Sequence, residues 1–246
     1  MSTQPTPPPR AADPHAERPS TLILLDIDGT LLHADGAGRA AMERSLRLVF
    51  GEFGARADLD GHSFGGKPDA QTLHELLLPL GVPRAEIAAR LPQFTANLAE
   101  EMARIIPQHR VRALPGVPER LQHWRARGDV LLGLLTGNTR ASAPVKLRAA
   151  GIDPDWFLIG AFGDEAPQRN QLAQLALQRA DAWRGQEFTR ERVFVIGDTP
   201  ADVACARAIH ARAIAISSGY CPREELLAAA PDQLVESFHE LAALLD

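Results

Sequence analysis

The chain has few of the residues that characterise several common protein classes. Its 246 residues include two cysteines, Cys205 and Cys221, too few for a disulfide framework, and their spacing is not that of a zinc-ligand pair. We therefore expect both to be reduced thiols. Lys and Arg number 26 against 31 Asp and Glu, for a net charge of −5. Without a basic excess to neutralise phosphates, nucleic acid is not an expected partner.

Long hydrophobic runs are also missing. Apolar stretches such as 130–135 are far shorter than the roughly 20 residues that cross a bilayer. The N-terminus lacks the basic start and apolar segment of a secretion signal. These absences predict no membrane association and a cytoplasmic location. Residues 1–20 hold proline, alanine and polar residues with little to bury, which predicts a flexible, Pro-rich tail.

Short apolar segments recur along the rest of the chain and are typical of buried strands. They alternate with helical patterns, an arrangement that predicts βαβ units, a parallel sheet and therefore an α/β fold. Ligands of such sheets bind at the carboxyl ends of the strands, so chemistry is expected there. The four segments are 21–26, 130–135, 193–196 and 213–216.

Between Gly36 and Leu114 the pattern is helical only. A block of helices inserted after the first strand predicts a separate helical lobe over 36–113, with 21–35 and 114–246 forming the α/β core. Three apolar stripes at helical spacing support this division: Met42, Leu46, Val49, Phe50 and Phe53; Leu73, Leu76, Leu77 and Leu80; and Ile87, Leu91, Phe94, Leu98, Met102 and Ile105.

The first strand ends in two carboxylates, Asp26 and Asp28, followed by Gly29 and Thr30. Two acids in this spacing beyond a strand suit a site where one acts covalently and the other transfers a proton. The alternative is a turn with solvated aspartates.

Two later strand ends carry complementary groups. Thr136, Gly137 and Asn138 follow the segment 130–135, and a hydroxyl with exposed amides can hold phosphate oxygens, although the same residues also form ordinary turns. Asp198 follows the segment 193–196, and Asp202 lies near the start of the helix predicted to begin around Pro200. Carboxylates shared between the strands of Asp26 and Asp198 would attract a hard cation, Mg²⁺ above all.

These three pieces, in this order, resemble the haloacid-dehalogenase-like superfamily in its phosphatase branch, with a helical cap inserted after the first motif. The resemblance covers nearly everything from Thr21 onwards. It implies a doubly wound parallel-sheet core, an all-helical cap that closes over the substrate, and Mg²⁺-dependent phosphoryl transfer through an aspartyl phosphate.

The resemblance also implies roles for individual residues. Asp26 corresponds to the nucleophile and Asp28 to the acid/base. Thr136, with the amide of Gly137 and the neighbouring Asn138, corresponds to the part that binds phosphate. The implied metal ligands are Asp26, the Asp28 backbone carbonyl and Asp198, with Asp202 in support.

The family's third motif supplies a lysine or arginine. Arg169, in a loop that opens a helix, has the expected place in the order, and we favour it. Lys146 is the alternative, but 144–150 has a helical pattern, in which a lysine is expected to be solvated. Either cation would neutralise charge on the phosphoryl oxygens.

Two further residues have an ordinary and a functional interpretation. Lys67 lies between two predicted cap helices, in Gly65-Gly66-Lys67-Pro68-Asp69, and is predicted either to contact substrate or to form a plain turn. His33 follows the first motif closely enough to approach the site, but an ordinary loop histidine is favoured.

The sequence therefore predicts a Mg²⁺-dependent phosphatase that acts on a small phosphorylated metabolite. Asp28 disfavours dehalogenase and phosphonatase chemistry, which lack an acid there. A sugar-phosphate mutase of the same superfamily is an alternative, but it usually has a histidine early in the first cap helix, where this chain has Gly38. A phosphoacceptor signalling domain would need about half this length, and a silent binding protein would not need the intact acids.

Overall fold

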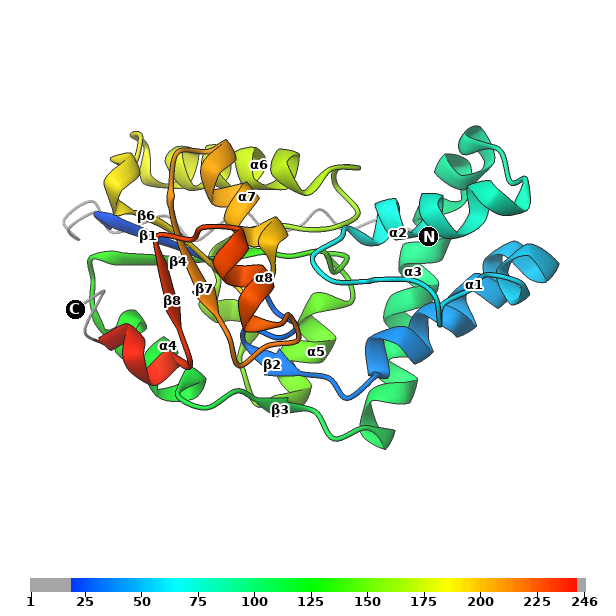
Figure 1. Cartoon of the computed structure of the whole chain (residues 1–246), viewed down its shortest axis with the longest axis horizontal. Coiled ribbons are helices and arrows are strands. Elements are labelled where there is room, and N and C mark those ends of the chain that lie inside the picture. The colour runs from blue at the N-terminus through cyan, green and yellow to red at the C-terminus, as the bar shows by residue number, and fades with distance from the viewer. Residues whose placement is uncertain (1–18, 243–246) are drawn as a thin grey trace, which may run out of the picture.

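The computed structural model describes residues 19–242, so the predicted tail lies almost entirely outside the described residues. A six-stranded parallel sheet forms the centre, in the order β5-β4-β1-β6-β7-β8 (Figure 1). Its strands are β1 (Thr21–Leu25), β4 (Val130–Leu135), β5 (Ile159–Ala161), β6 (Val193–Gly197), β7 (Arg212–Ile216) and β8 (Gln233–Val235). The four predicted strands are β1, β4, β6 and β7.

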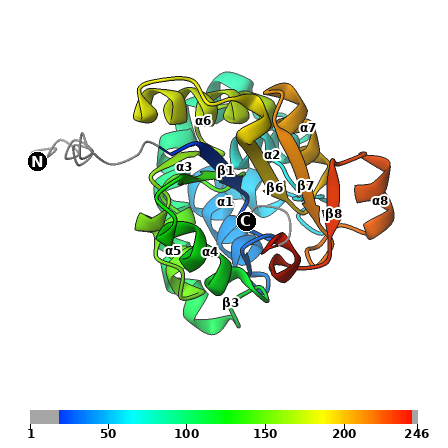
Figure 2. The ribbon, with the colours of Figure 1, turned by 90° about the vertical axis from the view of Figure 1, so that its left-hand side faces the viewer.

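Helices cover both faces of the sheet, as the alternation of side chains along β1 requires. Leu22 and Leu24 belong to the apolar cluster that includes α6 and α7, whereas Ile23 and Leu25 belong to the cluster that includes α4 and α5. Figure 2 shows these two helix pairs on opposite sides of the strands. The core is therefore doubly wound. Its helices are α4 (Val117–Ala126), α5 (Ala143–Ala149), α6 (Arg169–Arg184), α7 (Pro200–Ala208) and α8 (Arg223–Ala228).

The predicted helical insert lies beside the carboxyl ends of the strands (Figure 1). It contains α1 (Ala37–Ala55), α2 (Asp69–Leu77) and α3 (Arg84–Ile105), and α1 packs along α3. A two-stranded antiparallel ribbon of β2 (Leu32–His33) and β3 (Arg112–Ala113) stands where the chain leaves and rejoins the core. This ribbon adjoins the boundaries predicted at residues 36 and 113, which we keep as proposed limits of the cap. Short 3₁₀ turns are Leu78–Leu80, Ile106–Gln108, Pro154–Trp156, Arg190–Arg192 and Phe238–Leu241.

One predicted stripe fails at its end. Met42, Leu46, Val49 and Phe50 are buried, but Phe53 is 41% exposed. The backbone of Gly51 has φ 55° and ψ −124°, so α1 is kinked there and the residues after it turn away from the stripe. Glycine takes this conformation without steric cost.

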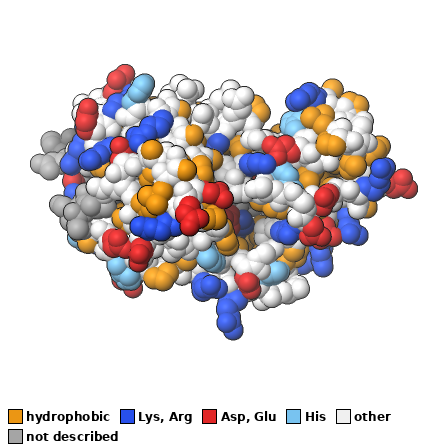
Figure 3. Space-filling view, in the orientation of Figure 1, with side chains coloured by type: hydrophobic (Ala, Val, Ile, Leu, Met, Phe, Trp, Pro, Cys, Tyr) orange, Lys and Arg blue, Asp and Glu red, His pale blue; other side chains and the backbone are white. Residues whose placement is uncertain are grey.

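Surface charges of both signs and two free cysteines are what the composition leads us to expect. Positive and negative side chains are interspersed on the face drawn in Figure 3. Within residues 19–242, no helix is long and apolar enough to span a bilayer. Cys205 and Cys221 are free, and burial raises the pKa of the Cys205 thiol to about 12, which keeps it protonated and unreactive.

Candidate active site

The turn after β1 fixes the positions of the two acids of the first motif, Asp26 and Asp28. The amide of Asp26 donates to the Ile196 carbonyl at 3.0 Å, which extends the pairing of β1 with β6 by one residue. The Ile27 carbonyl then accepts from three successive amides, those of residues 30–32. Gly29 has φ +79°, and a Cβ there would lie 2.1 Å from Oδ2 of Asp198. Glycine at this position therefore lets the Asp198 carboxylate approach the first motif.

Asp26, Asp198 and Asp202 form a buried acidic cluster, with carboxylate oxygens within 4.8 Å of one another. Asp198 accepts from the Tyr220 amide at 2.8 Å. Oδ2 of Asp202 accepts from the amide and hydroxyl of Thr199, at 3.0 and 2.6 Å, where α7 begins as predicted. Folding thus brings the acids of β1 and β6 together, as the sequence analysis expected.

Burial and mutual repulsion leave this cluster with more negative charge than it can hold at low cost. Burial, with the Asp26 charge, raises the pKa of Asp198 to about 8. Burial also raises the pKa of Asp26 to about 6, although Arg169 opposes the shift. Hard oxygen ligands with uncompensated negative charge are what Mg²⁺ requires, so the residues present fit this ion.

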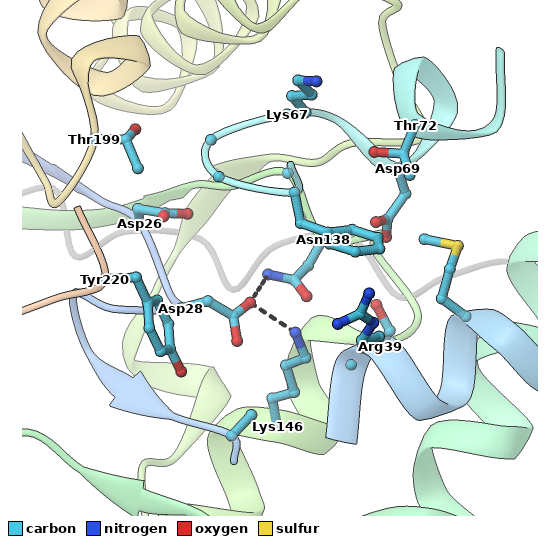
Figure 4. A pocket seen from close by; sticks show the side chains of 18 of the residues that line it. Asp26, Asp28, Arg39, Lys67, Asp69, Thr72, Asn138, Lys146, Thr199 and Tyr220 are labelled. Carbon is cyan, nitrogen blue, oxygen red and sulfur yellow. Dashed lines mark hydrogen bonds and ion pairs between the residues drawn. The ribbon is translucent and has the colours of Figure 1, made fainter. Parts of the chain in front are cut away.

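Both candidate cations reach the site. Arg169 begins α6, and its Nη2 lies 3.2 Å from Oδ1 of Asp26 and 2.5 Å from Oδ1 of Asp202. Lys146 is buried, and its Nζ lies 2.6 Å from Oδ2 of Asp28 (Figure 4). The expectation that a lysine of this helix would be solvated is wrong, because α5 turns Lys146 towards Asp28. Arg169 therefore pairs with Asp26 and Asp202, and Lys146 pairs with Asp28.

The second motif joins the first through an amide. Nδ2 of Asn138 donates to Oδ2 of Asp28 at 2.8 Å and to Oγ1 of Thr136 at 2.9 Å. Gly137 and Asn138 line a cavity of about 470 Å³ together with Asp26 and Asp28. Thr136 is fully buried beneath them. The predicted phosphate-binding residues thus lie at the predicted acids, with Asn138 as the link.

Lys67 and His33 lie at the edge of this site. Lys67 closes a turn through its amide on the Phe64 carbonyl, lines the cavity, and pairs its Nζ with Glu75 at 2.6 Å. His33 stacks on Tyr220, with ring centroids 4.5 Å apart. Burial lowers the pKa of His33, whose stacking partner Tyr220 itself lines the cavity.

The sequence analysis assigned no role to several lining residues, and Asp69 stands out among them because its carboxylate accepts from the Thr139 amide at 3.2 Å. It is the first residue of α2, and burial raises its pKa to about 7, although Lys146 opposes the shift. An acid in the first turn of a helix is ordinary, so no local signal marks it. Arg39, Thr72, Ser142 and Tyr220 also line the cavity without having been predicted.

Comparison with known proteins agrees with this geometry. A family model described as haloacid dehalogenase-like hydrolase matches residues 23–207, more than half of the chain. The chain belongs to the haloacid dehalogenase-like hydrolases. The family match and the phosphatases among the relatives support a phosphoric monoester hydrolase.

Individual relatives cover almost the whole chain. A phosphoglycolate phosphatase of Synechococcus elongatus is 27% identical over 223 residues, 89% of this chain and 94% of the relative. Among solved structures, a CbbY variant of Rhodobacter sphaeroides in complex with xylulose-(1,5)bisphosphate has a TM-score of 0.63 at 21% identity, covering 92% of this chain and 99% of that one. A Thermotoga maritima protein provisionally described as beta-phosphoglucomutase has a TM-score of 0.56 at 22% identity, covering 91% and 98%. At these identities the structures establish the fold alone.

Proposed function

We propose that this hydrolase is a Mg²⁺-dependent phosphatase that releases phosphate from a small phosphomonoester through an aspartyl-phosphate intermediate. The observation that carries the proposal is the pairing of two differently placed acids at one cavity. Asp26 is buried among carboxylates and Arg169, while Asp28 is partly exposed and held by Lys146 and Asn138. The phosphatase named among the relatives supports the same class.

In the first half of the reaction, an oxygen of Asp26 forms a bond to phosphorus while the bond from phosphorus to the substrate's ester oxygen breaks. Asp28 gives its proton to the leaving alkoxide. In the second half, Asp28 takes a proton from water, the water oxygen bonds to phosphorus, and the bond to Asp26 breaks. Phosphate leaves and both acids return to their starting states.

The remaining residues hold these groups and balance charge. Asp26, the Asp28 carbonyl and Asp198 would hold Mg²⁺, with Asp202 in support, and the ion supplies neutralisation of the phosphoryl oxygens. Arg169 adds positive charge beside Asp26. Thr136 and the Gly137 amide are proposed to contact the phosphoryl group, and Lys67 the rest of the substrate.

An exchange of the nucleophile tests the proposal. Asp26→Asn should abolish phosphate release from a panel that includes phosphoglycolate and sugar monophosphates, because an amide oxygen is a poor nucleophile. The circular dichroism spectrum should match that of the wild type. Asp35→Asn, on the loop after β2, serves as a control with normal turnover. Appreciable Mg²⁺-dependent release by Asp26→Asn would contradict the proposal.

The mutase alternative is less well supported by the cavity. Gly38 lines the cavity, at the place where a mutase usually has its histidine, and glycine has no side chain to move a proton. Assays that follow isomer formation beside free phosphate separate the two reactions. A phosphoaspartate that lasts minutes instead of turning over would favour a signalling role.

A further inference from the structure

The first turn of α2, which belongs to the insert, lies against two loops of the core. The Asp69 amide donates to the Gly137 carbonyl at 2.9 Å, and the Ala70 amide donates to the Gly163 carbonyl at 3.3 Å. In return, the Thr139 amide donates to Oδ2 of Asp69 at 3.2 Å. One helical turn thus makes three hydrogen bonds to the loops that follow β4 and β5.

The start of α2 and the loops of the core lie so close together that two core positions at this contact require glycine. A Cβ at Gly137 would lie 2.1 Å from the Lys67 carbonyl oxygen. A Cβ at Gly163 would lie 1.8 Å from the Gly137 carbonyl oxygen and 2.8 Å from the Asp69 nitrogen. These clashes are with backbone atoms, which cannot rotate away. Gly137 therefore lets the insert approach the core, and Gly163 lets the two core loops and the start of α2 meet.

Asp69 forms hydrogen bonds to the residues on both sides of Asn138, which belongs to the site. Asp69 holds the Gly137 carbonyl with its amide and the Thr139 amide with its carboxylate. Asn138 stands between these two anchor points and donates to the Asp28 carboxylate at 2.8 Å. Figure 4 shows Asp69 on the insert side of the cavity and Asn138 directed at Asp28. The path from the insert to Asp28 is therefore Asp69, the loop 137–139, and the Asn138 amide.

We propose that Asp69 is a positioning residue, which seats α2 on the loop 137–139 and thereby fixes Asn138 and Asp28 for proton transfer. This inference rests on the proposed role of Asp28 in phosphate ester hydrolysis. Asp69 itself transfers no proton in this account. Its oxygen acts only as an acceptor for the Thr139 amide.

Two substitutions of Asp69 test this assignment in the Mg²⁺-loaded full-length protein with p-nitrophenyl phosphate. Asp69→Ala removes the acceptor and should lower kcat tenfold or more, with KM changed less than threefold. Asp69→Asn keeps an oxygen for the Thr139 amide and should retain kcat within about threefold of the wild type. An acid or base at this position would not be rescued by asparagine.

Asp164, on the loop after β5, offers a matched control, because its carboxylate also accepts from an amide next to the loop 137–139. Its Oδ1 accepts from the Arg140 amide at 2.8 Å, one residue beyond Thr139, but both partners belong to the core. Asp164→Ala should leave kcat within threefold of the wild type. An equal loss in Asp164→Ala and Asp69→Ala would show that loop stability alone matters and would overturn the role of the insert.

Amide hydrogen exchange gives a readout that does not depend on activity. In Asp69→Ala, the amides of 137–140 should exchange at least tenfold faster than in the wild type, while those of β1 and β6 stay unchanged. If Asp69→Ala folds poorly, Asp69→Asn decides: exchange of the amides of 137–140 within threefold of the wild type supports positioning, and exchange at least tenfold faster overturns it.

The outcomes separate this inference from the proposed function. Loss of kcat in both Asp69→Ala and Asp69→Asn without faster exchange would overturn positioning in favour of proton transfer or substrate binding. Unchanged kcat and exchange in Asp69→Ala would overturn it outright. A wild type that releases no phosphate from any substrate would refute the proposed function and with it the catalytic role of Asp69, whereas an active wild type with an insensitive Asp69 refutes this inference alone.

Discussion

Glu165 shows how one carboxylate can fix a loop beside the site. Its carboxylate accepts four hydrogen bonds. Two come from Arg179, both at 2.8 Å, one from Arg140 at 2.9 Å, and one from the Phe162 amide at 3.0 Å. Burial opposes ionisation, yet these donors lower the pKa of Glu165 from 4.5 to about 2. Because the folded pKa lies below the unfolded one, the stabilisation is complete above about pH 4.5 and is lost as the pH falls towards 2.

Glu165→Gln should therefore lower the free energy of unfolding at pH 7 by roughly 1–2 kcal/mol, a value discounted because Arg140 is largely exposed. Urea unfolding at pH 7, 5 and 3.5 should show this deficit shrinking at the lowest pH. The exposed Glu191→Gln should change the free energy of unfolding by less than about 0.5 kcal/mol throughout. A deficit independent of pH would contradict the assignment.

Residues of the site divide by whether the sequence marks their position, as a strand end does, or leaves it to packing and backbone contacts. Asp26, Asp28 and Asp198 could be predicted because each follows an apolar strand, and the ends of parallel strands meet. Lys146 was misjudged because the direction in which α5 presents its side chains depends on packing, which its pattern does not encode. Asp69 was missed because its contacts are with backbone groups of distant loops, and every sequence has those.

At the scale of elements, the start of α7 depends on one hydroxyl. Thr199 donates from its amide and its Oγ1 to Oδ2 of the buried Asp202. Thr199→Ala should lower the free energy of unfolding by about 1–2 kcal/mol, since a charged acceptor loses a donor at a helix N-terminus. Thr199→Ser keeps the hydroxyl and should stay within about 0.5 kcal/mol of the wild type in urea unfolding. Equal stability of all three proteins would disprove this role.

Prediction of elements succeeded where the apolar pattern was long and failed where it was short. The strands β1, β4, β6 and β7 have five or six residues each, whereas β5 and β8 have three and give too little pattern to recognise. Phe53 left its predicted stripe because the single residue Gly51 breaks the helical geometry of α1. Helix periodicity carries no information across such a break.

For the whole molecule, the order of elements could be predicted but the seating of the insert on the core could not. Periodicity identifies the strands and the inserted helices, and parallel connectivity then determines the α/β core. The seating of α2 on the core depends on glycines at 137 and 163, which in sequence look like turn residues. The cavity between the insert and the core is therefore a property of the assembled fold.

The acidic charge at that cavity predicts that a divalent cation stabilises the whole molecule. Burial raises the pKa of Asp198 to about 8, so the ionised cluster costs folding free energy unless a cation compensates it. At a Mg²⁺ concentration a hundredfold above the dissociation constant, binding should stabilise the folded state by about 2.7 kcal/mol. For a chain of this length, that stabilisation corresponds to a rise in Tm of about 5–10 °C. Thermal unfolding with MgCl₂, against NaCl at equal ionic strength, measures this shift.

Asp198→Asn separates ion binding from general salt effects. Its amide oxygen can still accept from the Tyr220 amide, so the fold is expected to persist. Without Mg²⁺ its Tm should equal or exceed that of the wild type, because the free-energy cost of burying or protonating the Asp198 carboxylate is gone. With Mg²⁺ its shift should fall to less than a third of the wild-type shift, because an anionic ligand is missing. An undiminished shift would place the cation away from the acids of β1 and β6.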